Sequence, residues 1–310
     1  MGSESILICG RPAAALGCRS TRAYAILCDY WTLTKPEVNL LIAVATFTGF
    51  TLGNSTRSQG FPFLLLIHTL LGTLLVASGT GTLNQYMERR FDAQMRRTAR
   101  RPLAAGRLKP SAGLWFGVSL SAIGTIYLAI AVNVLASLLA IVTMLSYLFL
   151  YTPLKRKTPL CTLVGAFPGA MPPLIGWAAA SGRLSLEVWT LYFILFLWQF
   201  PHFMAIAWMY REDYARAGYL VLPRGESNAG FMRWLIMLPL LALIFVSLIP
   251  VFIGHAGRAY AVGTLLLGSS FLYFGAQLAL RKSNSVARQL LLASIAYLPL
   301  VFVLLMLDKG

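Results

Sequence analysis

Residues 61–83 read FPFLLLIHTLLGTLLVASGTGTL, an apolar run that contains no Asp, Glu, Lys or Arg. About 20 consecutive apolar residues are enough for one helix to cross the hydrocarbon core of a bilayer, so this run predicts a transmembrane helix. Similar runs recur along almost the whole chain, and only 12% of its residues are charged, whereas a soluble domain usually carries about 25%. The sequence therefore predicts an all-α, polytopic membrane helix bundle.

We expect about nine transmembrane helices from the length of the apolar runs. The expected spans are residues 37–53, 61–83, 112–132, 134–152, 162–180, 187–209, 231–253, 259–280 and 288–307. Together they predict one membrane domain over residues 29–310, preceded by a flexible cytoplasmic tail over residues 1–28.

The net charge of +16 follows the predicted topology. If the N-terminus lies in the cytoplasm, all but four of the 26 Lys and Arg residues fall on the inner side; the exceptions are Arg57, Arg183, Arg258 and Lys309. This asymmetry is the positive-inside pattern, and an odd number of spans then puts the C-terminus outside. We therefore expect an integral protein of a bacterial cytoplasmic (inner) membrane, whose positive charge faces membrane lipid rather than nucleic acid.

Three oxygen-bearing side chains follow the span at 61–83 and form the first candidate site. Asn84, Glu88 and Asp92 are spaced by four residues, which puts them along one stripe of a helix that continues this span. Carboxylate and amide oxygens suit a hard cation such as Mg²⁺, which is usually shared with substrate phosphates. The alternative is an ordinary solvated helix end, in which these acids pair with neighbouring arginines.

A second acidic segment lies just beyond the span at 187–209. It contains Glu212 and Asp213, flanked by Arg211 and Arg216. The chain has only ten Asp and Glu residues, and the two segments hold four of them on one predicted face. Because acids are costly next to a bilayer, this concentration favours a functional site over two chance helix ends. Three basic side chains are suited to grip the oxygens of a diphosphate: Arg97, Arg101 and Lys155.

Several motifs resemble those of one enzyme family. They are Leu33–Asn39, Asn84–Asp92, Met95–Thr98, Arg101–Leu103, Tyr151–Arg156, Gly169–Trp177, Trp198–Phe203, Arg211–Tyr214 and Ala217–Gly218. From about residue 29 to the ninth span, the chain is similar to the heme O synthases, or protoheme IX farnesyltransferases, of the UbiA-type intramembrane prenyltransferase superfamily. The first acidic motif indicates only the superfamily, whereas the PPLIGW and QFPHF stretches indicate the heme branch. Glu88 departs from the pattern, since superfamily motifs more often have Asp there.

The resemblance implies a helix bundle around a central cavity that opens sideways to lipid. It implies transfer of the farnesyl group of farnesyl diphosphate to a vinyl group of heme B, which is a substrate and not a cofactor, to give heme O and diphosphate. Mg²⁺ is the implied cofactor, and the implied catalytic and metal-binding residues are Asn84, Glu88, Asp92 and Asp213. The implied substrate-binding residues are Arg97, Arg101, Lys155, Tyr151, Glu212 and His202. A downstream heme A-forming enzyme is an implied partner.

Alternatives stay open for one residue and for the function. His202, which lies between Pro201 and Phe203, could ligate heme iron or form a helix–helix hydrogen bond beside the proline. The acidic motifs do not separate heme from another prenyl acceptor, such as a quinone precursor or a chlorophyll-type macrocycle. A transporter of an anionic lipid precursor would carry its charges near the membrane midplane, whereas these acids lie at one face. If the protein were a purely structural subunit, neither acidic segment would have a function.

Overall fold

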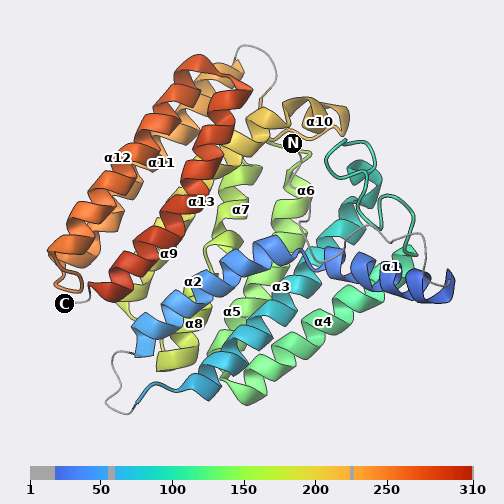
Figure 1. The fold of residues 1–310 in the computed structure, drawn as a ribbon, viewed down its shortest axis with the longest axis horizontal. Coiled ribbons are helices and arrows are strands. Elements are labelled where there is room, and N and C mark those ends of the chain that lie inside the picture. Colours follow the sequence, from blue (N-terminus) through green and yellow to red (C-terminus); the bar gives the residue numbers. More distant parts are fainter. Residues whose placement is uncertain (1–17, 55–59, 224–226, 309–310) are drawn as a thin grey trace.

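The computed structural model describes residues 18–54, 60–223 and 227–308, and every regular element in these ranges is helical. The elements are α1 (Cys18–Leu33), α2 (Pro36–Asn54), α3 (Phe63–Asp92), α4 (Pro110–Ala131), α5 (Val134–Leu145), the π-helix η1 (Ser146–Tyr151), α6 (Thr152–Leu154), α7 (Cys161–Gly169), α8 (Pro172–Ser181), α9 (Leu186–Met209), α10 (Arg211–Arg216), α11 (Ser227–Phe252), α12 (Arg258–Arg281) and α13 (Asn284–Leu307). In Figure 1, α11, α12 and α13 form one side of the bundle and α4 lies on the opposite side.

Nine segments of the described chain are long and apolar enough to cross a membrane. They are α2, α3, α4, the α5–η1–α6 segment, the α7–α8 segment, α9, residues 230–252 of α11, α12 and α13. Each overlaps one predicted span, so the predicted all-α bundle of about nine transmembrane helices is confirmed. The central cavity stays a prediction.

The helix with the first acidic segment is longer than its apolar run. α3 continues without a break for 30 residues, from Phe63 to Asp92. At 1.5 Å per residue such a helix is about 45 Å long, whereas the hydrocarbon core is about 30 Å thick. The stripe of Asn84, Glu88 and Asp92 therefore lies on a continuation of the span, as its spacing predicts.

Glycines allow the helices around α3 to approach closely. A Cβ atom on Gly49 of α2 would overlap the carbonyl of Pro173 in α8, and a Cβ on Gly176 of α8 would overlap the carbonyl of Thr46. Small residues at helix contacts permit this packing in a membrane, where the lipid itself is apolar and hydrophobic association is weak. The α2–α8 contact is therefore a close one.

The fourth span contains a π-helical turn just before its C-terminal end. Pro153 has no amide hydrogen to donate to the preceding turn, and the hydroxyl of Thr152 donates to the Tyr147 carbonyl at 2.8 Å. Single π-helical turns inside α-helices are frequent at functional sites. This one ends at Tyr151, four residues before Lys155, which belongs to the predicted site.

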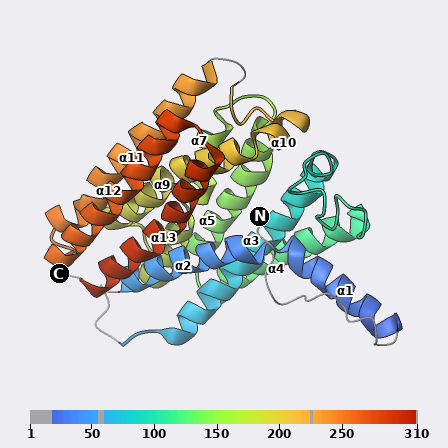
Figure 2. The same cartoon turned by 45° about the horizontal axis from the view of Figure 1, so that its top comes forward.

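The predicted tail over residues 1–28 is helical where the structure describes it. Residues 18–28 form the larger part of α1, and the stretch from Cys18 to Leu33 has no Gly or Pro to interrupt a helix. The flexible cytoplasmic tail stays a prediction. Residues 1–17 lie outside the described residues. α1 projects from the bundle (Figure 2) and exposes Leu27 and Trp31. An apolar face on a helix at this position suits a membrane interface.

Candidate active site

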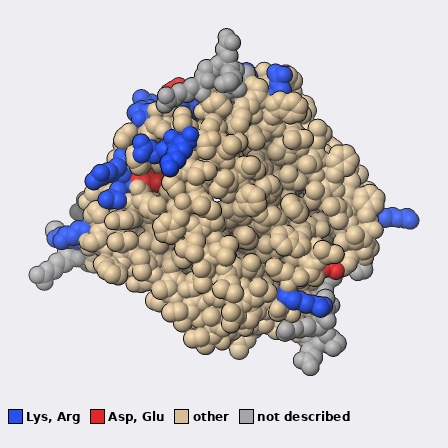
Figure 3. Space-filling view, turned by 180° about the vertical axis from the view of Figure 1, so that it is seen from behind, with Lys and Arg blue, Asp and Glu red and all other residues tan. Residues whose placement is uncertain are grey.

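The two acidic segments meet at the same end of the bundle, near α6 and α10 (Figure 1). The loop after α3 joins them: the backbone amide of Arg97 donates to Asp213 Oδ2 at 3.1 Å, and Arg216 donates to the Gln94 carbonyl at 3.4 Å. Seen from behind, Lys and Arg side chains gather around acidic atoms on one side of the molecule (Figure 3). The sequence prediction that both segments lie on one face therefore agrees with the structure.

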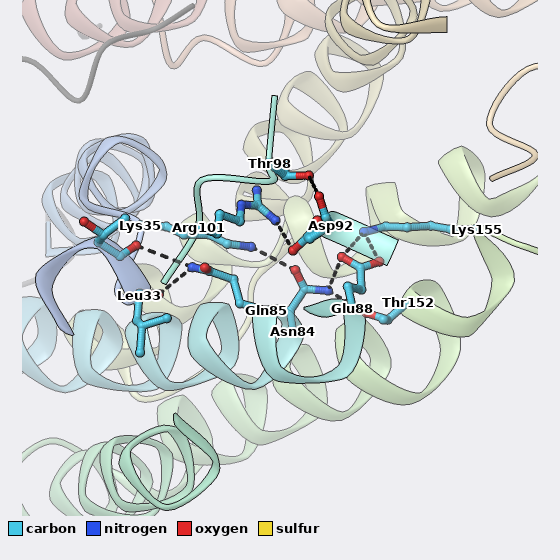
Figure 4. A network of polar contacts seen from close by, with 11 residues as sticks. Leu33, Lys35, Asn84, Gln85, Glu88, Asp92, Thr98, Arg101, Thr152 and Lys155 are labelled. Atoms are coloured by element: carbon cyan, nitrogen blue, oxygen red, sulfur yellow. Dashed lines mark hydrogen bonds and ion pairs between the residues drawn. The ribbon is translucent and has the colours of Figure 1, made fainter. Parts of the chain in front are cut away.

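Each oxygen-bearing residue of the α3 stripe contacts a basic side chain from elsewhere in the chain (Figure 4). The three contacts are Lys35 Nζ to Asn84 Oδ1 at 2.9 Å, Lys155 Nζ to Glu88 Oε1 at 2.8 Å, and an Arg101 nitrogen to Asp92 Oδ2 at 2.7 Å. Asn84 and Asp92 are each 1% exposed and Glu88 is 6% exposed. Charges buried to this degree require partners, and here every carboxylate has one.

The amide of Asn84 has a defined orientation. Its Nδ2 donates to Glu88 Oε2 at 3.0 Å and to the Thr152 hydroxyl at 3.2 Å. Since both donors point along the stripe toward α6, the amide oxygen faces the ammonium group of Lys35. The carbonyl of Asn84 and the carboxylates of Glu88 and Asp92 thus form one row of oxygen atoms, which is met by a row of cations.

The cations are crowded, and their pKa values reflect it. Burial lowers the pKa of Lys35 to about 7, and the nearby positive charges of Arg101 and Lys155 contribute in the same direction. Burial also disfavours the charged form of Lys155, but the adjacent Glu88 outweighs this effect and raises the pKa of Lys155 well above its ordinary value. Three basic groups beside two carboxylates leave a local excess of positive charge, which suits an anionic ligand.

The second acidic segment contributes one buried carboxylate. Asp213 is 7% exposed, and it accepts the Arg97 amide and an ion pair from Arg216 at 3.1 Å. The side chain of Glu212 is 79% exposed and lies 4.0 Å from Arg211. The structure therefore brings Asp213 to the loop after α3 and leaves Glu212 outside the cluster.

The donor set on α3 fits a magnesium ion. Mg²⁺ prefers oxygen ligands and usually takes one or two protein carboxylates, several waters and substrate phosphates. Glu88, Asp92 and the Asn84 carbonyl provide such oxygens. Among the described residues, no three His, Cys, Asp or Glu side chains are grouped closely enough to hold a metal. Three of the four predicted ligands lie on the α3 stripe and the fourth, Asp213, lies on α10; the full set stays a prediction.

Two other predicted site residues, Arg97 and Tyr151, each take part in a cation–π contact. The guanidinium of Arg97 lies over the ring of Tyr210, 5.0 Å from its centroid. The ring of Tyr151 lies under the ammonium of Lys155 at 4.6 Å. A cation held over an aromatic face gains about 0.5–2 kcal/mol. Tyr151 therefore contacts the site through Lys155, and Arg97 does so through its backbone.

Comparison with known sequences now identifies the family. The UbiA prenyltransferase family matches residues 41–302. The chain belongs to the UbiA prenyltransferase family. It is 50% identical over 287 residues to a protoheme IX farnesyltransferase of Solibacter usitatus (strain Ellin6076), covering 91% of this chain and 98% of that protein. It is 42% identical over 294 residues to one of Koribacter versatilis (strain Ellin345), covering 92% and 94%.

Solved structures of UbiA relatives share the fold. A digeranylgeranylglyceryl phosphate synthase superposes with a TM-score of 0.72 at 17% identity, covering 91% of this chain and 98% of that one. A UbiA homolog from Archaeoglobus fulgidus bound to GPP and Mg²⁺ gives a TM-score of 0.58 at 13% identity, covering 89% and 99%. The predicted family, the helical fold and the nature of the chain as an integral membrane protein are therefore confirmed.

Sequence reasoning missed several members of this UbiA-type site. Lys35 precedes α2 in the quoted Leu33–Asn39 stretch, yet its contact with Asn84 depends on how that stretch turns. Thr152 and Tyr219 are both buried at the site. Burial and the nearby Glu88 carboxylate raise the pKa of Tyr219, and the amide of the next residue, Leu220, donates to the Lys155 carbonyl at 2.7 Å. The signal for Lys35 was its position in a matched motif; Tyr219 had no signal beyond its place after Ala217–Gly218.

His202 links α9 to α13. Its Nδ1 lies 2.8 Å from Ser294 Oγ, and that hydroxyl donates to the Leu291 carbonyl at 2.6 Å. Because the serine hydrogen is used there, the serine oxygen accepts and His202 Nδ1 carries the hydrogen. The ring also stacks on Trp198, with centroids 4.7 Å apart. The expected helix–helix hydrogen bond is therefore present, and it leaves the lone pair of Nε2 available; a role as an iron ligand stays a prediction.

Proposed function

We propose that this protein transfers the farnesyl group of farnesyl diphosphate to a vinyl group of heme B, giving heme O and diphosphate. The observation that carries the proposal is the partly buried row of Lys35, Arg101 and Lys155 opposite the buried oxygens of α3. Such a row suits a diphosphate, whose oxygens form strong charge-assisted hydrogen bonds with cations. The names of the bacterial relatives support heme as the acceptor.

Binding of farnesyl diphosphate would change which groups the basic side chains of the cluster contact. The three cations would turn from the α3 oxygens to the phosphate oxygens, which frees Asn84, Glu88 and Asp92 to hold Mg²⁺. A solved UbiA homolog is bound to GPP and Mg²⁺, which supports the presence of a metal ion together with a prenyl diphosphate. The bound ion would supply positive charge against the departing diphosphate. Tyr151 would keep the Lys155 ammonium in place during the exchange.

The reaction divides into steps that these residues can assist. The allylic C–O bond of farnesyl diphosphate breaks and its electron pair leaves with diphosphate, whose growing charge Lys35, Arg101 and Lys155 stabilise. The farnesyl cation is then attacked by the π electrons of the heme vinyl group, which forms the new C–C bond. Water adds to the resulting cation and loses a proton, so that the product carries a hydroxyethylfarnesyl group. Each bond is accounted for without an oxidant.

Mass analysis of the porphyrin product tests this function directly. Purified protein with farnesyl diphosphate, heme B and Mg²⁺ is expected to yield a porphyrin that is heavier by one farnesyl and one hydroxyl group, together with diphosphate. Unmodified heme, with prenylation of a supplied quinone precursor or chlorophyll-type macrocycle instead, would overturn the assignment of the acceptor.

We further propose a location in the bacterial inner membrane, with the N-terminus cytoplasmic and the C-terminus outside. The distribution of Lys and Arg supports it. A C-terminal alkaline phosphatase fusion should then be active in intact cells, and a C-terminal fluorescent protein exported in unfolded form should be dark; the opposite pair of results would reverse the orientation.

A further inference from the structure

The turn between α1 and α2 has an unusual backbone. Lys35 has a φ angle of 54°, in the left-handed region that L-residues seldom adopt. The Lys35 carbonyl accepts the first bonds of α2, from the amides of Val38 and Asn39, each at 3.1 Å. The turn thus ends one helix, starts the next and sends the Lys35 side chain toward α3. Contacts from outside the turn have to hold it in this shape.

Polar side chains of α3 hold the turn by its backbone carbonyls. Gln85 Nε2 donates to the Leu33 carbonyl at 3.1 Å and lies 3.4 Å from the Thr32 carbonyl. The hydroxyl of Thr82 lies 3.3 Å from the same Leu33 carbonyl. The last carbonyls of a helix have no partners within it, so α3 caps α1 from the side, as Figure 4 shows for Gln85 and Leu33.

The NH₂ group of the Gln85 amide, rather than its carbonyl, forms the hydrogen bonds to the turn. Gln85 is 2% exposed, and its Oε1 has no hydrogen-bond partner in the part of the chain that the structure describes. A buried carbonyl without a partner is destabilising, and an apolar side chain of similar size would avoid this cost. The NH₂ group that holds the turn is therefore the reason for a glutamine at this place.

We infer that Gln85 is a positioning residue for the diphosphate site and acts through Lys35. Asn84 and Gln85 are neighbours on α3 and project about 100° apart around its axis. Asn84 receives the Lys35 ammonium, and Gln85 holds the chain two residues before Lys35. Two neighbouring residues of α3 thus hold the C-terminal end of α1 and the ammonium group of Lys35. The inference rests on the proposed function only in that Lys35 binds the diphosphate.

A double-mutant cycle tests the inference. Gln85→Met keeps the length of the side chain and removes the donor. Loss of one well-placed hydrogen bond predicts that the Kd for farnesyl diphosphate, measured with Mg²⁺ and without heme, rises about tenfold. The kcat at saturating farnesyl diphosphate should fall as well, because Lys35 also stabilises the growing charge on the departing diphosphate. In a Lys35→Met background the same substitution should have no further effect on Kd, because no ammonium remains to be placed.

The control is Gln289→Met, an exposed glutamine of α13, which should leave Kd unchanged. If Gln85→Met does not fold, Gln85→Asn replaces it, since the shorter amide misses the Leu33 carbonyl. An unchanged Kd, or an equal rise with and without Lys35, overturns the inference. Wild-type protein that binds farnesyl diphosphate but forms no heme O would overturn the proposed acceptor alone, and the cycle would still decide the role of Gln85. Wild type that binds no farnesyl diphosphate would overturn both.

Discussion

Lys155 and Glu88 form a buried ion pair of 2.8 Å that joins the end of the fourth span to α3. The two side chains are 14% and 7% exposed, so neither charge is well solvated. Their separation in the sequence is large, and the π-helical turn before Lys155 sets the position of the ammonium. This pair is the point at which the proposed phosphate-binding cation and the proposed metal-binding carboxylate neutralise each other.

Replacing Lys155 should therefore weaken substrate binding and the fold together. Lys155→Met removes a charge-assisted bond to phosphate worth about 1.5–3 kcal/mol, so the KM for farnesyl diphosphate should rise about 10- to 100-fold. It also leaves Glu88 buried without its ammonium, so the unfolding temperature should fall. Lys157→Met, an exposed position two residues on, is the matched control and should change neither quantity. A wild-type KM in Lys155→Met would remove Lys155 from the site.

The acidic residues should differ sharply in importance. Asp92→Asn weakens the contact with Arg101 and removes a metal-binding carboxylate, so the rate of heme O formation should fall on the order of a hundredfold. Glu212→Gln alters a side chain that is 79% exposed, so its rate should stay close to wild type. Initial rates at saturating substrates measure both. Equal losses in the two variants would contradict the separation of Glu212 from the cluster.

The spans were predictable because hydropathy is a local property of the sequence. All nine runs overlap helices of the described chain, and the acids on α3 stood out because a chain in contact with lipid has few. Spacing in the sequence predicts which residues share a face only within one helix. The structure also shows which residues of different helices lie together. Glu212 and Asp213 are adjacent in α10, so their side chains point about 100° apart and only one can face the cluster.

The contact of Lys35 with Asn84 was beyond sequence reasoning for a different reason. It depends on a left-handed backbone at a lysine, a conformation that L-residues seldom adopt outside special settings. The same holds for Thr152, whose place beside Asn84 follows from a π-helical turn. Such features arise from tertiary contacts that compensate a local cost, so no window of the sequence reveals them.

Removing divalent metal should stop the reaction without unfolding the protein. Lys155 and Arg101 already compensate Glu88 and Asp92, so the carboxylates do not repel one another when no ion is bound. A chelator should therefore abolish heme O formation and leave the unfolding temperature unchanged, and added Mg²⁺ should restore the rate. Full activity after complete chelation would refute the metal assignment. A large drop in unfolding temperature would show that the cations do not compensate the acids.

His202 on α9 is proposed as a ligand of the iron of heme B. Histidines that bind a metal usually donate their second ring nitrogen to a fixed partner, which holds the tautomer and the ring. Ser294 accepts from Nδ1 and so leaves the Nε2 lone pair for a ligand. His202→Ala should therefore change the absorption spectrum of bound heme B.

Ser294→Ala separates the two roles of the histidine. It removes the hydrogen bond but keeps the imidazole, so it should lower the unfolding temperature and shift the heme spectrum less than His202→Ala does. Optical titration with heme B measures both variants against wild type. An unchanged spectrum in His202→Ala, with equal loss of stability in the two variants, would leave His202 as a link between α9 and α13 only.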